Sequence, residues 1–108
     1  MKLVFRPAAL RDLQETAGYI ETTLGNPAAA KKLKKTVLET CSLLKKQPYM
    51  GPALRGRFEE LDTELRYFVA AKQLIFYEVQ SKQVEVVRIL DGRMDYLAIL
   101  FGENGELT

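Results

Sequence analysis

The 108-residue sequence has no histidine, so several large classes of enzyme are excluded at the outset. Histidine is the usual general base near neutral pH and a common zinc ligand, and it activates the nucleophile in Ser-His and Cys-His pairs. The sequence also lacks the glycine-rich patterns that bind dinucleotides or nucleoside triphosphates. Any catalysis would therefore depend on arginine, lysine, tyrosine and carboxylate side chains, and no metal or other cofactor is expected.

Cysteine occurs once, as Cys41, which excludes an intramolecular disulfide and favours a reducing compartment. Because Cys41 occupies an apolar position of a predicted helix, we expect its thiol to be buried and inert. No apolar run reaches the roughly 20 residues of a membrane span, and residues 1–7 do not resemble a signal peptide. The expectation is a cytoplasmic protein with no membrane partner.

The formal net charge of +2 conceals a strongly basic segment. Residues 31–57 carry eight positive side chains against a single acid, and an acidic block follows directly. Such a surface can attract phosphate or an acidic partner, but lysines also commonly solvate the outer face of a helix. The candidate basic patch consists of Lys31, Lys32, Lys34, Lys35, Lys45 and Lys46.

The first half of the sequence predicts a strand and two helices. A short apolar run at residues 3–5 stops at Pro7, and helical periodicity then places Leu10, Leu13, Ala17, Ile20 and Leu24 on one face. Gly18 within that helix suggests a close neighbouring helix, and Gly25 ends it. Asn26-Pro27 then caps a second helix, which ends before Pro48. Its apolar stripe contains Ala30, Leu33, Val37, Cys41 and Leu44.

The second half predicts an antiparallel meander of three strands at residues 65–71, 74–79 and 84–90. A short helix over residues 94–101 and a frayed end at about residues 102–108 complete a single domain, 1–108. The predicted class is α+β, with the helical hairpin packed on the sheet.

Three arginines lie on or beside the predicted sheet, namely Arg66, Arg88 and Arg93. If they converge, their guanidinium groups suit phosphate, and Tyr67, Tyr77 and Tyr96 offer stacking surfaces or protons. Alternatively, Arg66 and Arg88 pair across strands with Glu64, Glu78 or Glu85, and Tyr77 belongs to the core.

The stretch LRYFVAAKQLIFYEV, followed by VEVVRILDGRMDY, resembles the carboxy-terminal half of the RelE/ParE toxin superfamily. The Tyr19-Ile20 helix end, the turn at residues 26–30 and the spacing of Leu44, Pro48 and Gly51 are also similar to that family. The resemblance extends over residues 2–101. It implies a fold with a short N-terminal strand, a helical hairpin and a sheet of three or four strands, in agreement with the elements predicted above.

The resemblance also implies the toxin of a bacterial type II toxin–antitoxin pair, neutralised by a small antitoxin. ParE-like members inhibit DNA gyrase by protein–protein contact, and RelE-like members cleave mRNA on the ribosome. We favour the ParE-like branch, because Asp91 replaces the histidine of the motif Arg-Ile-Leu-His and an aspartate would repel RNA phosphate. The alternatives are a metal-independent ribonuclease using Arg66, Tyr77, Arg88 and Arg93, and an inert homologue that only binds antitoxin.

Antitoxin binding would bury apolar side chains that the toxin's own core leaves exposed. The candidates are Tyr19 and Leu38 on the helices and Leu97, Leu100 and Phe101 in the tail. The alternative is that the tail packs on its own sheet.

Overall fold

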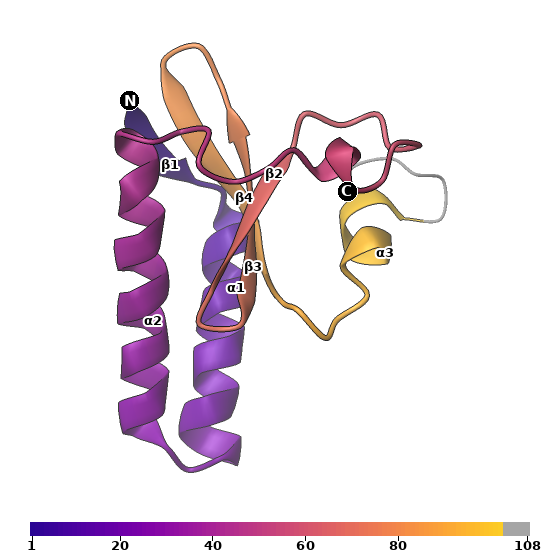
Figure 1. Ribbon diagram of the computed structural model, residues 1–108. Helices are drawn as coiled ribbons and strands as arrows, with labels where there is room; N and C mark the ends of the chain where they lie inside the picture. The colour runs from indigo at the N-terminus through magenta and orange to yellow at the C-terminus, as the bar shows by residue number, and fades with distance from the viewer. Residues whose placement is uncertain (103–108) are drawn as a thin grey trace.

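The computed structural model of the chain describes residues 1–102, so the predicted fraying beyond Gly102 lies outside the described residues. A four-stranded sheet lies between a hairpin of two long helices and a short helix, α3 (Figure 1). The main elements are β1 (Lys2–Phe5), α1 (Pro7–Gly18), α2 (Pro27–Ser42), β2 (Arg66–Ala70), β3 (Gln73–Val79), β4 (Gln83–Asp91) and α3 (Tyr96–Phe101).

The turn of the helical hairpin follows the sequence prediction closely. Gly25 adopts a φ of +62°, a conformation that glycine reaches without the steric cost of a side chain. The Asn26 side chain accepts a hydrogen bond from the Ala29 amide at 3.1 Å, and Pro27 is the first residue of α2. Cap, proline and glycine together fix where one helix ends and the next begins.

The first helix departs from its predicted form in two respects. Residues Tyr19–Thr23 form a π-helical turn after α1 instead of continuing the α-helix. Gly18 has no neighbour among residues 1–102 within 4 Å of the position a Cβ would occupy, so the expected close helix approach is wrong. Its carbonyl instead accepts a hydrogen bond from the Thr22 hydroxyl at 2.7 Å.

Only part of the predicted apolar stripe on α1 faces the sheet. Leu13 and Ala17 are buried there together with Ala9, but Leu10 and Leu24 are exposed. The buried face is therefore narrower and is lined mainly by small side chains, which lets α1 lie close to β4. The α2 stripe is confirmed in full, since all its members are buried: Ala30, Leu33, Val37, Cys41 and Leu44.

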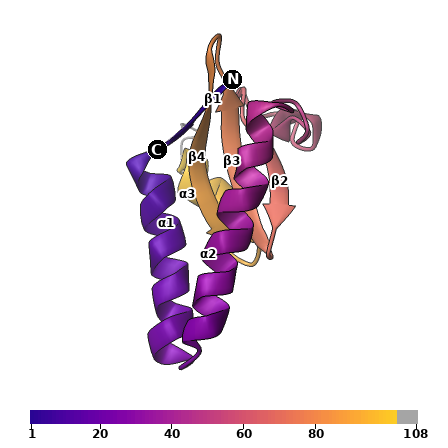
Figure 2. The same ribbon diagram turned by 90° about the vertical axis from the view of Figure 1, so that its left-hand side faces the viewer.

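The sheet order is β1-β4-β3-β2, and the last three strands form the predicted antiparallel meander within about a residue at each end. The first strand pairs parallel to the last, with Lys2 opposite Gln83 and Phe5 opposite Val86. Figure 2 shows α1 and α2 side by side on one face of the sheet. Strand β2 thus forms one edge of the sheet and β1 the other.

Two cores lie on opposite faces of the sheet. Alternate strand residues point to each face, so Tyr77 packs under the hairpin and its neighbour Phe76 packs under α3. The loop before β2 completes the second core with Leu54 and Leu65. Helix α3 begins at Tyr96, two residues later than predicted.

Candidate functional site

Arg88 is held against α1 by a carboxylate that the sequence did not connect with it. Its Nε and Nη2 donate to the two oxygens of Asp12 at 2.7 and 2.8 Å, and the backbone N–H of Ile89 donates to the same carboxylate at 3.0 Å. The hydrogen bond with Asp12 raises the pKa of Arg88. The alternative pairing of Arg88 with Glu64, Glu78 or Glu85 is therefore wrong.

A β-bulge interrupts the alternation of side chains in β4 next to Arg88. Phe76 on β3 lies opposite Arg88, whereas the next residue, Tyr77, lies opposite Val86. Val87 is therefore an extra residue in β4, and the alternation of side chains between the two faces of the sheet shifts by one residue beyond it. The apolar run in the sequence does not reveal this irregularity.

Arg66 is bound to the loop before β2, not to a glutamate as the alternative interpretation held. Its Nε donates to the Gly51 carbonyl at 2.7 Å, and its guanidinium lies 5.1 Å from the centre of the Tyr49 ring. The Gly51 N–H in turn donates to the Tyr77 hydroxyl at 2.9 Å. Because Tyr77 is fully buried, it is the core residue that the same interpretation predicted.

Arg93 forms a local ion pair just after β4. Its Nε and Nη2 each lie 3.0 Å from a different oxygen of Asp91, and its backbone N–H donates to that carboxylate at 2.9 Å. The Arg93 side chain lowers the pKa of Asp91, so this carboxyl is ionised near neutral pH. An ionised Asp91 has no proton to give as a general acid.

The three arginines therefore have three separate partners, and the condition for a phosphate site, that they converge, is not met. Strand β3 separates Arg66 on β2 from Arg88 on β4. Tyr67 and Tyr96 are half-buried in the second core, with ring centres 6.5 and 5.5 Å from that of Phe76. Among residues 1–102, no cluster of arginine and tyrosine side chains forms a phosphate site of the kind the sequence suggested.

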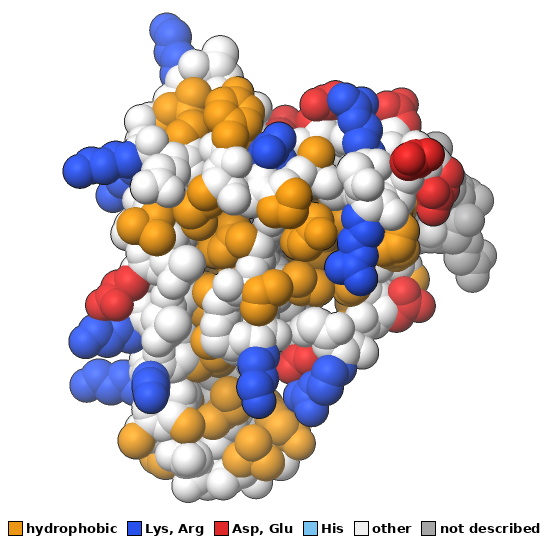
Figure 3. Space-filling model, viewed as in Figure 1, with side chains coloured by type: hydrophobic (Ala, Val, Ile, Leu, Met, Phe, Trp, Pro, Cys, Tyr) orange, Lys and Arg blue, Asp and Glu red, His pale blue; other side chains and the backbone are white. Residues whose placement is uncertain are grey.

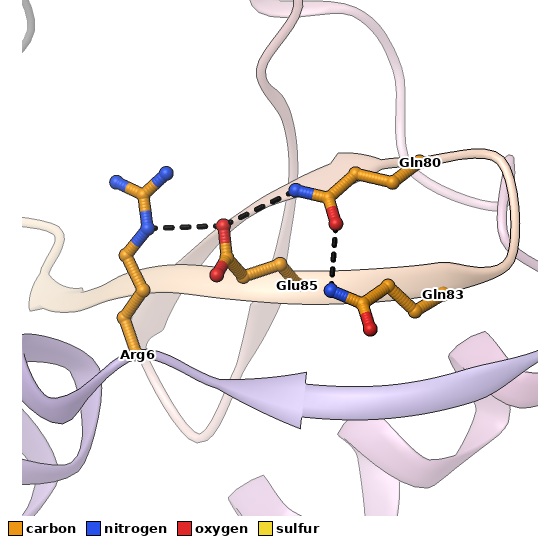
Figure 4. A network of polar contacts seen from close by, with 4 residues as sticks. All are labelled: Arg6, Gln80, Gln83 and Glu85. Carbon is orange, nitrogen blue, oxygen red and sulfur yellow. Dashed lines mark hydrogen bonds and ion pairs between the residues drawn. The ribbon is translucent and has the colours of Figure 1, made fainter.

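A fourth arginine belongs to a polar network that the sequence analysis missed. Figure 4 shows Arg6, at the end of β1, donating through Nε to Glu85 at 3.0 Å. Gln80 donates to the same carboxylate oxygen at 3.3 Å and accepts from Gln83 at 2.7 Å. The network joins β1 to the β3–β4 hairpin, and only the tertiary pairing of these strands brings its members together.

The exposed apolar candidates divide into two groups. Tyr19 is 56% exposed and Leu38 is also exposed, as predicted. Leu97 is half-buried, whereas Leu100 and Phe101 are buried in the second core, so their predicted exposure is wrong. The tail packs on its own sheet, as the alternative held. Seven further large apolar side chains of residues 1–102 are exposed and were not among the predicted contacts, namely Met1, Leu10, Leu24, Leu43, Tyr49, Val69 and Met94.

The lysines of the candidate basic patch lie on α2 and the turn after it, and all are exposed except the half-buried Lys34, which donates to Gln14 at 3.3 Å. Figure 3 views the molecule from the side of α2 and the β2 edge. Lysine and arginine side chains project on the α2 side, apolar side chains lie along the middle, and acidic ones gather near the loop before β2. The charge asymmetry of the sequence is thus also an asymmetry of the surface.

Within residues 1–102, no three histidine, cysteine, aspartate or glutamate side chains are placed to hold a metal ion. No helix of this part of the chain is both long and apolar enough to cross a membrane.

Comparisons with known proteins agree with the fold. The family model described as "ParE toxin of type II toxin-antitoxin system, parDE" matches residues 3–96. A solved structure titled "Chromosomal ParDE TA system from P. aeruginosa" has a similar chain, with a TM-score of 0.69 and 19% identity. The match covers 84% of this chain and 95% of that one, and at this identity it shows the shared fold alone. No curated protein matches significantly.

Proposed function

Because this chain belongs to the ParE toxin family of type II toxin–antitoxin systems, we propose that it inhibits DNA gyrase by protein–protein contact and is neutralised by a small antitoxin. In this proposal the toxin works by covering a surface of its target, and no bond of a substrate is broken. The alternative within the superfamily, cleavage of mRNA, would require groups that bind phosphate and transfer protons.

The main support for inhibition by protein–protein contact, as opposed to mRNA cleavage, is that the candidate arginines already have hydrogen-bond partners within the protein. Arg88 and Arg93 each donate two hydrogen bonds to one carboxylate, which neutralises much of their charge. Arg66 is bound to the Gly51 carbonyl and packs over Tyr49. Asp91 is ionised and Tyr77 is buried, so neither is placed to transfer a proton, and the exposed Arg93 is the one of these residues whose side chain is open to solvent.

The edge strand β2 favours binding of an antitoxin segment. The loop before β2 covers the beginning of this edge, since Tyr67 N–H donates to the Pro52 carbonyl and Leu54 N–H to the Leu65 carbonyl. Val69 lies past this covered part and its side chain is 63% exposed. An exposed edge strand with an apolar side chain favours the addition of a further strand or the docking of an amphipathic helix.

The lysines of α2 favour an acidic partner. Lys31, Lys32 and Lys35 are exposed on one helix, and the acidic block at residues 59–64 lies in the loop before β2. Attraction between this face and an acidic antitoxin would speed association and would weaken as salt concentration rises.

Paired pulse labelling tests the proposal. DNA and protein synthesis are followed in one bacterial culture during the first minutes after the chain is induced without antitoxin, and purified gyrase is assayed for supercoiling with and without the chain. Early loss of DNA synthesis together with inhibited supercoiling supports gyrase as the target. Early loss of protein synthesis overturns it in favour of mRNA cleavage, and no loss of either favours an inert homologue.

A further inference from the structure

A groove of about 220 Å³ lies where the tip of the helical hairpin meets the end of the sheet. One wall comes from the end of α1, the π-helical turn and α2, and the other from the β2–β3 turn and the end of β4. Apolar side chains from both walls line it, so the groove suits an apolar group. Its lining residues are Thr16, Tyr19, Ile20, Leu24, Leu33, Ala71, Lys72, Gln73, Asp91 and Arg93.

Gln73 gives this groove a specific polar feature. It is the first residue of β3, lies opposite Asp91 in the sheet and is only 4% exposed. Its side-chain oxygen Oε1 is buried and has no hydrogen-bond partner among residues 1–102. Buried carbonyl oxygens nearly always accept a hydrogen bond in folded proteins, so this atom is open to a donor from a bound partner or from water.

The rim of the groove is positively charged. Lys72 and Arg93 line it against one acid, Asp91, and because Asp91 pairs with Arg93, Lys72 supplies most of the net positive charge. A second, apolar hollow of about 370 Å³ shares Ile20, Leu33 and Ala71 with the groove and adds Lys32 to the positive charge. An acidic segment would therefore be attracted to this end of the molecule.

We propose that this groove binds an apolar side chain of the antitoxin, with an adjoining N–H donating to Gln73 Oε1 and neighbouring acidic residues facing Lys72 and Arg93. The inference rests on the proposed function and names where and how the antitoxin is recognised. A polypeptide meets all three requirements at once, because it brings an apolar side chain, an N–H donor and a carboxylate within a few residues. Nucleic-acid phosphate would leave the apolar walls uncovered and would supply no donor to Gln73.

Glutamine-to-methionine variants test the assignment. Gln73→Met keeps the length of the side chain and removes the acceptor together with the hydrogen bond that the Gln73 amide makes to Asp91. Gln83→Met is the control at the opposite end of β4, where it likewise removes an amide that donates to a neighbouring side chain. The probe is the small protein encoded beside this gene, titrated by calorimetry into the purified chain. Gln73→Met is expected to bind about tenfold more weakly, and Gln83→Met is expected to bind within twofold of wild type.

Thermal unfolding of each free variant separates loss of binding from loss of folding. Gln73→Met loses an unpartnered buried acceptor and the hydrogen bond to Asp91, two effects of opposite sign, so its unfolding midpoint is expected to stay close to that of wild type. Leu24→Asn provides an independent check, since Leu24 lines the groove yet is exposed, and this variant is also expected to fold normally and bind more weakly.

The outcomes distinguish failure of the groove from failure of the proposed function. If wild type binds the neighbouring protein and the Gln73 and Leu24 variants bind as well as wild type, the groove assignment is overturned while the antitoxin proposal stands. A water molecule as the only partner of Gln73 would give this result. If wild type does not bind, the antitoxin proposal and the groove assignment are overturned together.

Discussion

The Asp12 carboxylate accepts hydrogen bonds from both Nε and Nη2 of Arg88, 76 positions away in the sequence. It also accepts from the backbone N–H of Ile89, at the edge of β4 just past the point where β1 ends. One side chain of α1 therefore pairs with the guanidinium of an arginine on β4. It also accepts the hydrogen bond from the Ile89 N–H that a carbonyl of a longer β1 would otherwise have accepted. This contact ties the helical hairpin to the last strand of the sheet.

Replacing Asp12 is expected to destabilise the fold substantially. Asp12→Ala leaves a largely buried guanidinium and the Ile89 N–H without their acceptor, so the free energy of unfolding should fall by about 2–3 kcal/mol. Urea denaturation measures the loss. The exposed pair Arg55–Glu64 provides the control, because Glu64→Ala should change stability by less than about 0.5 kcal/mol. Equal effects of the two variants would contradict the assigned role of Asp12.

Gly51 is expected to be intolerant of a side chain. A Cβ at Gly51 would collide with the backbone carbonyl of Tyr67 and touch the Tyr77 hydroxyl. Gly51→Ala must displace backbone, so a loss of about 3 kcal/mol in unfolding free energy is expected. Gly56 is the matched position, since no atom of residues 1–102 lies within 4 Å of its Cβ site, and Gly56→Ala should be close to neutral. A stable Gly51→Ala protein would show that the loop shifts easily.

Burial raises the pKa of the Cys41 thiol from its ordinary value of 9.0 to about 12. Between these pH values the unfolded chain loses the thiol proton and the folded chain keeps it, so stability falls as the pH rises. The expected loss is about 1.4 kcal/mol per pH unit. Denaturation at several pH values measures it, with Cys41→Val as the reference that subtracts the titration of tyrosines and lysines. Identical slopes for the two proteins would refute this expectation.

The Asn26 cap is expected to contribute about 1 kcal/mol to stability. Its side chain accepts from the Ala29 N–H, one of the amides at the start of α2 that has no carbonyl partner within the helix. Asn26→Ala should lower the unfolding free energy by that amount, and Asn26→Asp should restore most of it by keeping the acceptor. Denaturation of the two variants under the same conditions decides the point. Equal losses would mean that the capping bond contributes little.

Growth inhibition is expected to survive replacement of Arg93. The side chain is 91% exposed and contacts only its neighbour Asp91 among the ion pairs of residues 1–102, so Arg93→Gln should leave the fold intact. A toxin that acts by contact with gyrase should still reduce colony counts by a similar factor when induced without antitoxin. A ribonuclease that used this guanidinium should lose most of its toxicity. Immunoblots of the soluble fraction confirm equal amounts of the two proteins.

Local sequence patterns predicted the elements of this fold well. The α2 stripe from Ala30 to Leu44, the Asn26-Pro27 cap and the order of the three meander strands depend on spacings of a few residues, which the sequence displays directly. The exposure of Tyr19 and Leu38 and the burial of Cys41 followed from the same helical periodicity.

The partners of the arginines could not be predicted from the spacing of residues in the sequence, because they depend on a strand irregularity and on how the helices pack. The bulge at Val87 changes which face of the sheet the later residues of β4 point to. Asp12 reaches Arg88 only because α1 packs against this last strand. The β2–β3 turn places Ala71 and Lys72 at positive φ values of 51° and 65°, where glycine or asparagine would have marked the turn. The groove beside this turn therefore had no counterpart in the sequence analysis.

The parallel pairing of β1 with β4 sets the order of events during synthesis. Lys2 cannot pair with Gln83 until Gln83 has been synthesised. At a translation rate of about 5–20 residues per second, the interval between the two residues is about 4–16 s. In the second half of this interval, after Ser42 has been made, the nascent chain has its helical hairpin but not the sheet that covers the hairpin's apolar face. Ribosomes that stall before β4 would release a fragment with an open core, which is a natural substrate for chaperones and proteases. The toxin therefore acquires its complete surface only near the end of its own translation.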